Sequence, residues 1–537
     1  MENSIFNRFG TMIDCSRNAV MNVDTVKEWI NLTSDLGYNS LMLYIEDTYE
    51  IENEPYFGHL RGRYSVKELK EIDKYAEIHN MEVIPCIQTL AHLNALFHWS
   101  EYSSINDCND IILVDDEKSY ELIDKMFNTF SVSLKTKIIH IGMDEATFIG
   151  RGKYQDKYGY KDRAEILLNH LVKVSNIAKK YGFTLVMWGD MFIRLANSGE
   201  YYVDDFSLPD ELKAKIPDNV IINYWDYYSF DDNHYDKQIK LHSKIKDPVW
   251  FAGGLWTWTG FVPRNEYSIK ATKAAFKACK ENDVKNVFLT LWGDNGSECS
   301  KFSVLPSLYY ASRLAVGITD EKEIKNGFFE KFGIDFDSFM QLDIPGSLTS
   351  KGELPRNPDK YYLYEDLFMG QFDYTVKENG NLPYLECANK TKQFISNKRF
   401  GYLFENISNL CSLVSLKIDL GVRTRKAYLS GNKKALCELL DDYNTLLFLI
   451  DKLYRSQEKQ WMKENKPHGF DVLDLRFGGL TFRVRHCKER IEAYINGELD
   501  SIIELEEPVL NYNGKNSDDF ESVYENRWQR IVSANAI

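Results

Sequence analysis

The chain has 537 residues, of which 44% are hydrophobic and 27% charged, and it carries a formal net charge of −15 at pH 7. This composition is typical of a folded globular protein and excludes a largely disordered chain. The acidic balance and the lack of a long run of lysine and arginine are unlike a nucleic-acid-binding protein, so we expect no nucleic-acid partner.

From residue 9 to about residue 317, short apolar runs alternate with amphipathic helical stretches, as in β/α units around a parallel sheet. We expect eight strands, at 10–14, 40–45, 82–87, 137–143, 184–188, 220–225, 249–255 and 287–292. Helices are expected at 25–36, 65–80, 163–180, 268–281 and 305–314. Eight such strands, with no G-x-G-x-x-G after the first, predict an α/β fold that closes as a (β/α)8 TIM barrel.

After about residue 335 this alternation stops, and the apolar spacing predicts helices at 392–420, 425–432, 434–463 and 480–495. We therefore expect two domains: a catalytic barrel at 1–335 and a mainly α-helical C-terminal domain at 336–537. Segment 466–479 holds Pro467, Gly469 and the pair Gly478-Gly479, which predicts a loop. This loop is either a plain connector or a segment that reaches a barrel mouth, its own or a partner's.

The nine cysteines are scattered from Cys15 to Cys487, and none forms a C-x-x-C pair. This pattern predicts free thiols in a reducing compartment. Residues 1–11 show no basic segment followed by an apolar one, and no run of about 18 apolar residues occurs anywhere. We therefore expect a cytoplasmic protein without a signal peptide or a membrane span.

Chemically active side chains gather at the predicted strand ends, where a (β/α)8 barrel builds its active site. Five of the ten tryptophans follow these ends, and nearly every strand adds a carboxylate or a cation. The tryptophans are Trp188, Trp225, Trp256, Trp258 and Trp292, and the polar groups include Asp14, Arg17, Glu46, Asp47, His92, Asp144, Glu145, Asp190, Asp226 and Asp294. Polar groups beside flat apolar rings suit a ligand with hydroxyls and an apolar face, so the sequence predicts a carbohydrate site.

The adjacent acids Asp144 and Glu145 are the sharpest feature. Glycoside cleavage needs one acid to protonate the leaving oxygen and a second group to stabilise the cationic centre. Neighbouring side chains of a strand point to opposite faces, so two adjacent acids serve one site only where a strand becomes a loop, and the apolar run 138–143 ends just there. Their mutual repulsion can also raise one pKa. A solvated acid pair at a loop start is the alternative.

The segment His140-Ile141-Gly142-Met143-Asp144-Glu145 resembles the H-x-G-G-D-E signature of glycoside hydrolase family 20, the β-N-acetylhexosaminidases. Three other segments are similar to the family pattern and follow its order: Arg8…Asp14-Cys15-Ser16-Arg17, Pro85…Ala91-His92 and Trp292-Gly293-Asp294. Together they span about residues 8–300. The resemblance implies the compact form of the family, in which the barrel comes first and a helical domain follows.

The resemblance also implies a reaction, the removal of terminal non-reducing β-linked N-acetylhexosamine with the sugar's own 2-acetamido carbonyl as nucleophile. Asp144 would orient the acetamido N–H and stabilise positive charge, and Glu145 would be the general acid and then the base. Arg17 would bind the C3 and C4 hydroxyls, with an ion pair to Asp14 or Glu46 at the barrel rim as the alternative. His92 would link Glu145 to an acid of strand 2, with Asp47 as the first choice. The other expected substrate contacts are Trp188, Tyr224, Trp225, Asp226, Trp256, Trp258, Trp292 and Asp294, with His140 in support. An oligosaccharide partner and a homodimer are expected, and no cofactor or metal.

The sequence departs from the family pattern at three places. Met143 replaces the second glycine of the signature, and Asp294 replaces a glutamate, which leaves both GlcNAc and GalNAc open as substrates. The Tyr-x-Asp usual on strand 7 is absent. Tyr224 or Tyr227, with Asp226, could supply the missing hydrogen bond to the acetamido oxygen.

Three other classes of protein remain as alternatives. Another barrel glycosidase acting on N-acetyl sugars would carry a D-x-E or Asp-Asp pattern at strand 4. A non-catalytic N-acetyl-sugar-binding barrel would be expected to have lost one acid, whereas both are present. A metal-dependent sugar isomerase would need a ligand cluster, and the sequence shows no H-E-x-x-H or similar spacing.

Overall fold

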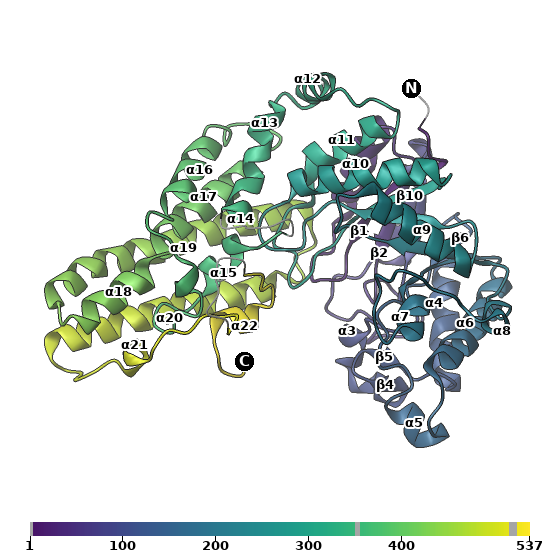
Figure 1. Ribbon diagram of the computed structural model, residues 1–537, viewed down its shortest axis with the longest axis horizontal. Coiled ribbons are helices and arrows are strands. Elements are labelled where there is room, and N and C mark those ends of the chain that lie inside the picture. Colours follow the sequence, from purple (N-terminus) through teal and green to yellow (C-terminus); the bar gives the residue numbers. More distant parts are fainter. Residues whose placement is uncertain (1–3, 349–354, 515–522) are drawn as a thin grey trace.

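The computed structural model describes residues 4–348, 355–514 and 523–537. Figure 1 shows a barrel wrapped in helices, coloured purple to teal, beside an elongated group of helices coloured green to yellow. The predicted (β/α)8 barrel followed by a mainly helical region is therefore confirmed.

Eight parallel strands close the barrel in the order β1-β10-β9-β8-β7-β6-β3-β2. Their bounds are β1 (Arg8–Asp14), β2 (Ser40–Tyr44), β3 (Glu82–Cys86), β6 (Ile138–His140), β7 (Thr184–Trp188), β8 (Val220–Trp225), β9 (Trp250–Gly254) and β10 (Asn286–Leu291). Two short strands, β4 (Asn106–Cys108) and β5 (Ile111–Ile112), pair outside the barrel. All eight predicted strands are present, and β6 ends earlier than expected because Gly142 and Met143 have positive φ angles of 68° and 70°.

Helices cover the outside of the barrel (Figure 1). The longer ones are α1 (Val23–Asp35), α2 (Val66–Ile78), α4 (Glu117–Ser133), α6 (Arg163–Lys180), α9 (Asp232–Ile245), α10 (Asn265–Glu281) and α11 (Leu305–Leu314). The shorter ones are α3 (Asn94–Phe97), α5 (Lys153–Tyr158), α7 (Asp190–Ala196) and α8 (Asp210–Lys213). Five of the longer ones, α1, α2, α4, α6 and α9, begin at a residue whose side chain caps the first turn. At α2 a capping box forms: the Ser65 hydroxyl accepts from the Glu68 N–H (3.1 Å), and the Glu68 carboxylate accepts from the Ser65 N–H (2.7 Å).

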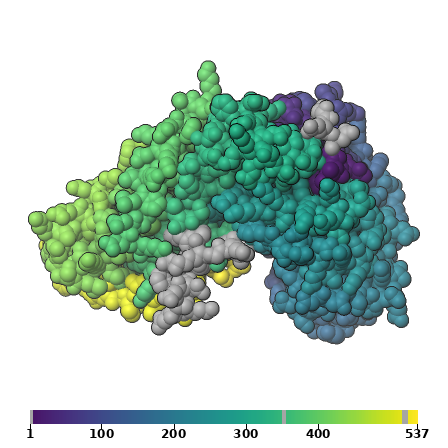
Figure 2. All heavy atoms as spheres, turned by 45° about the horizontal axis from the view of Figure 1, so that its top comes forward, coloured from purple at the N-terminus to yellow at the C-terminus, as the bar shows by residue number. Residues whose placement is uncertain are grey.

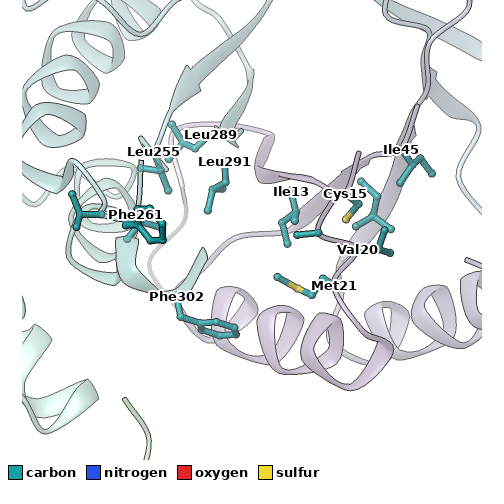
Figure 3. Packing of buried hydrophobic residues seen from close by; sticks show 14 of the residues in the cluster. Ile13, Cys15, Val20, Met21, Ile45, Leu255, Phe261, Leu289, Leu291 and Phe302 are labelled. Carbon is teal, nitrogen blue, oxygen red and sulfur yellow. The ribbon is translucent and has the colours of Figure 1, made fainter. Parts of the chain in front are cut away.

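Alternate residues of each strand build two separate apolar layers. Met12 belongs to the group that fills the barrel interior, together with Trp250 and Phe288, whereas Ile13 belongs to the layer between strands and helices. Figure 3 shows part of this outer layer, in which Ile13, Met21 and Phe302 gather near a helix of the N-terminal part. The barrel is therefore packed along its axis, which leaves only its end open for a site.

The C-terminal region is a group of helices around two long ones, α19 (Lys433–Glu464) and α20 (Phe470–Asn496). The others are α13 (Phe336–Phe339), α14 (Ile344–Ser347), α15 (Pro358–Tyr364), α16 (Leu382–Lys392), α17 (Gly401–Lys417), α18 (Leu420–Leu429), α21 (Ile503–Glu506) and α22 (Trp528–Val532). Helix α12 (Glu321–Phe332) connects the two regions and contacts both α11 and α13.

The prediction of a loop over 466–479 is wrong beyond Gly469, because α20 begins at Phe470. Leu473, Phe477 and Leu480 are buried at helical spacing. Their burial outweighs the cost of the two helical glycines, about 1 kcal/mol each.

The segment before α20 lies against the chain's own barrel. The Lys466 ammonium donates to the Arg63 carbonyl (3.0 Å) and pairs with Glu68 (2.8 Å). A Cβ on Gly469 would meet the Asn18 carbonyl oxygen at 2.4 Å, and the φ of this glycine is +86°. The segment therefore contacts loops of the chain's own barrel, and residues 466–469 are not among those that line the cavity at its mouth.

A buried group of charges joins the two regions, which Figure 2 shows as adjoining lobes. Glu298, which follows β10, accepts from Lys360 of α15 and from Arg476 of α20, both at 2.7 Å. All three residues are at most 7% exposed. Arg476 also donates to the carbonyl of Asn295 (2.9 Å), so a helix of the C-terminal region fixes the loop that carries Asp294.

Replacing Glu298 by glutamine should lower the free energy of unfolding by about 3–5 kcal/mol, because two buried cations lose their carboxylate. The measurement is urea unfolding followed by circular dichroism. Glu321→Gln is the matched control, since Glu321 pairs with Lys273 at the surface (2.9 Å, Glu321 side chain 64% exposed) and its removal should cost about 1 kcal/mol or less. Equal small changes for the two variants would contradict this account of the interface.

Candidate active site

A cavity of about 510 Å³ opens at the carboxyl ends of the barrel strands. Its walls are formed by Arg17, His92, Asn94, Asp144, Glu145, Trp188, Trp225, Tyr227, Tyr228, Trp258, Trp292, Asp294, Asn295 and Arg527. Most of these residues follow β-strands, and Arg527 comes from the C-terminal region. The cavity combines charged groups with indole and phenol rings, as the strand-end pattern predicted.

The turn after β6 places both acids in the cavity. Gly142, Met143 and Glu145 have φ angles of 68°, 70° and 53°, so the chain leaves the alternation of a strand before Asp144. Gly142 is required for space as well, since a Cβ there would lie 2.0 Å from the Gln88 amide oxygen. Met143 is a non-glycine residue in the left-handed region, which explains why the family signature has a glycine at this position.

Asp144 is held as a carboxylate by two donors. The Gln88 amide donates to its Oδ1 (2.8 Å), and the His92 Nε2 lies 3.2 Å from its Oδ2. Burial raises the pKa of Asp144, but the His92 charge and these contacts outweigh burial and lower that pKa to about 2. Burial lowers the pKa of His92, but the charge of Asp144 and its hydrogen bond outweigh burial and raise that pKa to about 10. The pair is therefore Asp144 carboxylate and His92 imidazolium at neutral pH.

Glu145 lies on the solvent side of this pair, with its side chain 51% exposed. One carboxylate oxygen is 3.8 Å from His92 Nε2, and the other is 3.9 Å from the Arg194 guanidinium. Its backbone N–H donates to the Asp190 carboxylate (3.2 Å). The backbone is thus fixed while the carboxyl group is free to meet a ligand.

Asp190, at the start of α7, lies behind Glu145 and accepts a hydrogen bond from its backbone N–H. It is fully buried and accepts from Arg194 Nε (3.1 Å) as well as from Glu145. Burial, and then repulsion by Asp144, raise the pKa of Asp190 to about 7, against the opposing effect of Arg194.

Replacing Asp190 by asparagine should remove a pH dependence of stability. Between the ordinary pKa of 3.8 and about 7, the unfolded carboxyl group ionises and the folded one stays protonated, so the stability of the wild type falls as pH rises. A shift of about three pKa units corresponds to up to about 4 kcal/mol of unfolding free energy. Between pH 4 and pH 7 the variant should therefore gain up to that amount of stability relative to the wild type. Unfolding at several pH values measures this difference, and a constant difference would contradict a raised pKa.

Arg17 lies at the floor of the cavity. Its guanidinium is 3.4 Å from Asp14 and 3.3 Å from Glu46, and it lies over the rings of Tyr44 and Trp292. Two carboxylates thus orient the guanidinium, whose remaining donors can bind paired hydroxyls.

Indole and phenol rings form the wall of the cavity. Trp188 packs on the buried imidazole of His140 (ring centroids 4.2 Å apart), and His140 is not among the residues that line the cavity. The Trp292 Nε1 donates to the Tyr227 hydroxyl (3.0 Å), and Tyr227 stacks with Trp225 (5.5 Å). The wall is therefore fixed by ring-to-ring contacts.

Tyr224 and Asp226 do not line the cavity, so their predicted contacts with the sugar are wrong. Both are fully buried. The Tyr224 hydroxyl donates to Asp226 (2.7 Å), and Asp226 also contacts His234 of α9 (2.6 Å). Trp225 faces the cavity, so its two neighbours on the strand face the helices. Tyr227 lines the cavity instead.

Two further predictions need correction. Trp256 lies behind Trp258, with the rings stacked at 4.3 Å, and does not line the cavity. Asp47 pairs with Arg61 (3.1 Å) and makes no contact with His92. His92 therefore joins Asp144 to Glu145, and of the two acids at the strand 2 end it is Glu46, not Asp47, whose charge acts on His92.

Four cavity residues were not among those predicted for the site: Asn94, Tyr228, Asn295 and Arg527. Behind the acids, Gln88 was not predicted either, and Asp190 was placed among the strand-end polar groups without a role. Gln88 and Asp190 stand at strand ends that the sequence located, so their positions gave a usable signal. Arg527 gave none, because it is hundreds of residues from the barrel strands. Within the described ranges, no group of three or more His, Cys, Asp or Glu is placed to hold a metal ion.

A closed parallel barrel with two acids and an aromatic wall at its strand ends defines a carbohydrate-active barrel protein. The family model described as "Glycosyl hydrolase family 20, catalytic domain" matches residues 6–287, and "Glycoside Hydrolase 20C C-terminal domain" matches residues 335–525. The catalytic match covers more than half of the chain, so the chain belongs to glycosyl hydrolase family 20.

Individual relatives are more distant. Hexosaminidase D of Bos taurus is 28% identical over 37% of this chain and 57% of its own length. Hexosaminidase D of Homo sapiens is 24% identical over 41% of this chain and 44% of its own length. The chain thus matches less than two thirds of either relative. A crystal structure of a β-N-acetylhexosaminidase from Bacteroides fragilis has 19% identity, covers 61% of this chain and 69% of that one, and has a TM-score of 0.47.

Proposed function

We propose that the protein is an exo-acting β-N-acetylhexosaminidase that removes terminal β-linked N-acetylhexosamine from oligosaccharides. The observation that carries the proposal is the pairing of Asp144 with His92 beside the half-exposed Glu145 in one aromatic-walled cavity. Family membership and the likeness to hexosaminidases support the same reaction.

Each acid has a role that its surroundings favour. Asp144 has a lowered pKa, so it is an ionised carboxylate that can only accept hydrogen bonds. Such a group can orient the acetamido N–H of the sugar and stabilise the positive charge that develops when the acetamido carbonyl attacks. Glu145 is exposed on the side where a leaving group departs, so it is the general acid and, for water attack, the general base.

The cavity wall suits the sugar. Trp188, Trp225 and Trp292 offer flat apolar surfaces to the ring face and the acetamido methyl group. Arg17 would bind the C3 and C4 hydroxyls at the floor, and Asp294 would accept from a C4 or C6 hydroxyl. Both C4 configurations, GlcNAc and GalNAc, are proposed as substrates.

A cytoplasmic location and a homodimer belong to the proposal as well. The location rests on the nine cysteines, which are all free thiols in the structure. In the part of the chain that the structure describes, no helix has the length and apolar character needed to cross a membrane.

The test is hydrolysis of aryl β-N-acetylglucosaminide and β-N-acetylgalactosaminide beside the plain aryl β-glucoside. Release from the N-acetyl substrates alone is expected, because the glucoside lacks the acetamido nucleophile. Rapid cleavage of the plain glucoside would overturn the proposed mechanism.

A further inference from the structure

The C-terminal segment 523–527 returns to the barrel and is fixed there by buried polar contacts. The Asn526 amide donates to the carbonyl of Trp258 (2.9 Å) and accepts from Lys360 (3.0 Å). Asn357 binds the backbone of Glu525 at both its N–H (3.1 Å) and its carbonyl (2.6 Å). These four bonds hold the backbone just before Arg527 against the cavity wall.

The Arg527 side chain is exposed and lines the cavity. Among the described residues it makes no ion pair, side-chain hydrogen bond or ring contact. The backbone N–H of Arg527 donates to Glu525 (2.9 Å), which further limits where the side chain can lie. A guanidinium held beside a cavity without a partner is free to bind an anion from solution.

The catalytic carboxylates do not need this cation. Asp144 has His92, and Glu145 has His92 and Arg194 within 4 Å. Asp14 and Glu46 share Arg17. The structure thus leaves Arg527 for the ligand.

Arg527 lies at the outer part of the cavity. Tyr228, another wall residue, is 39% exposed, and Tyr524 on the same segment as Arg527 is 42% exposed. The deep wall is formed by Trp188, which is 1% exposed. A sugar whose acetamido group reaches the deep wall has its glycosidic oxygen toward the exposed Glu145, so the leaving sugar extends to the outer part.

We propose that Arg527 is a specificity-determining residue that binds an anionic group, a carboxylate or a sulfate, on the leaving-group side of the substrate. The inference rests on the proposed function, since that function defines the leaving group. Arg527 selects substrates in which the N-acetylhexosamine is linked to an acidic sugar. Attraction by Arg527 offsets the repulsion expected from a chain of net charge −15.

The experiment compares kcat/KM for an N-acetylglucosamine β-linked to glucuronic acid with that for the same linkage to glucose. Arg527→Gln should lower the acidic-to-neutral ratio about 10-fold, since a charged hydrogen-bonded contact is lost. Arg527→Lys should retain part of the preference, because it keeps the charge without the planar fork. Arg485→Gln is the matched control: Arg485 is exposed on α20 and absent from the cavity wall, and the same change in net charge should leave the ratio as it is.

A ratio unchanged in Arg527→Gln would overturn the proposal. A third substrate, an aryl N-acetylglucosaminide with a 6-sulfate, places the anion on the cleaved sugar. A fall confined to this substrate would overturn the leaving-group assignment.

Binding is measured as well, by quenching of tryptophan fluorescence in Glu145→Gln with the two disaccharides. If the wild type hydrolyses no N-acetyl substrate, the proposed function fails, and the binding ratio still decides the role of Arg527. A preference for the acidic disaccharide that is lost with Arg527→Gln supports that role, and equal binding rejects it.

Discussion

Glu145→Gln should lower kcat/KM by about 10³-fold on oligosaccharides, because a glutamine cannot protonate the leaving oxygen. The loss should be smaller on aryl glycosides with acidic phenols, which leave without protonation. Steady-state kinetics on a series of phenols with different pKa values measures this dependence. The backbone N–H of residue 145 keeps its contact with Asp190 in the variant, so the turn should stay folded.

Glu165→Gln is the control for this prediction, since Glu165 is exposed in the first turn of α6 and absent from the cavity wall. It should retain the wild-type rate. A loss in Glu145→Gln that is the same for every leaving group would argue against a general acid and for a role in binding alone.

Asp144→Asn should lower kcat/KM by about 10²–10³-fold on N-acetyl substrates, because the developing positive charge loses its carboxylate. The imidazole of His92 should respond too. Asp144 is the main group that raises the pKa of His92, so that pKa should fall from about 10 when the charge is removed. Kinetics and the NMR titration of the His92 ring protons measure the two effects.

The two readouts for Asp144→Asn separate catalysis from structure. A large rate loss with an unchanged His92 titration would mean that the pairing at 3.2 Å does not persist in solution. A shifted titration with a normal rate would remove Asp144 from the catalytic step.

The barrel and its rim were readable from the sequence because buried parallel strands are continuous apolar runs. β7 and β8 begin and end at the expected residues, and α6 and α11 do as well. Asp144, Glu145, Arg17, His92 and Asp294 all line one cavity, as residues at the ends of strands of one barrel should.

The errors have specific physical causes. Tyr224 and Asp226 were assigned by proximity to a strand end, but they alternate with Trp225 along the chain, so their side chains point away from the cavity, toward α9. Asp47 follows the correct strand, yet it pairs with the side chain of Arg61, which lies later in the same loop between β2 and α2. Strand position fixes the layer in which a residue lies, and only loop packing decides its partner.

Arg527 could not be predicted, since no local pattern says where a chain returns after a long helical region. Its place depends on contacts such as that between Asn526 and Lys360, which form between distant segments.

The buried group formed by Glu298, Lys360 and Arg476 has a consequence for the modularity of the protein. Within this group the charges are divided between the two regions: the barrel contributes the carboxylate, and the helical region contributes the two cations. Exchanging one region for that of another family member would separate the charges unless both sides of the contact were transplanted together. A substitution of one of these buried charges therefore requires a matching substitution in the other region.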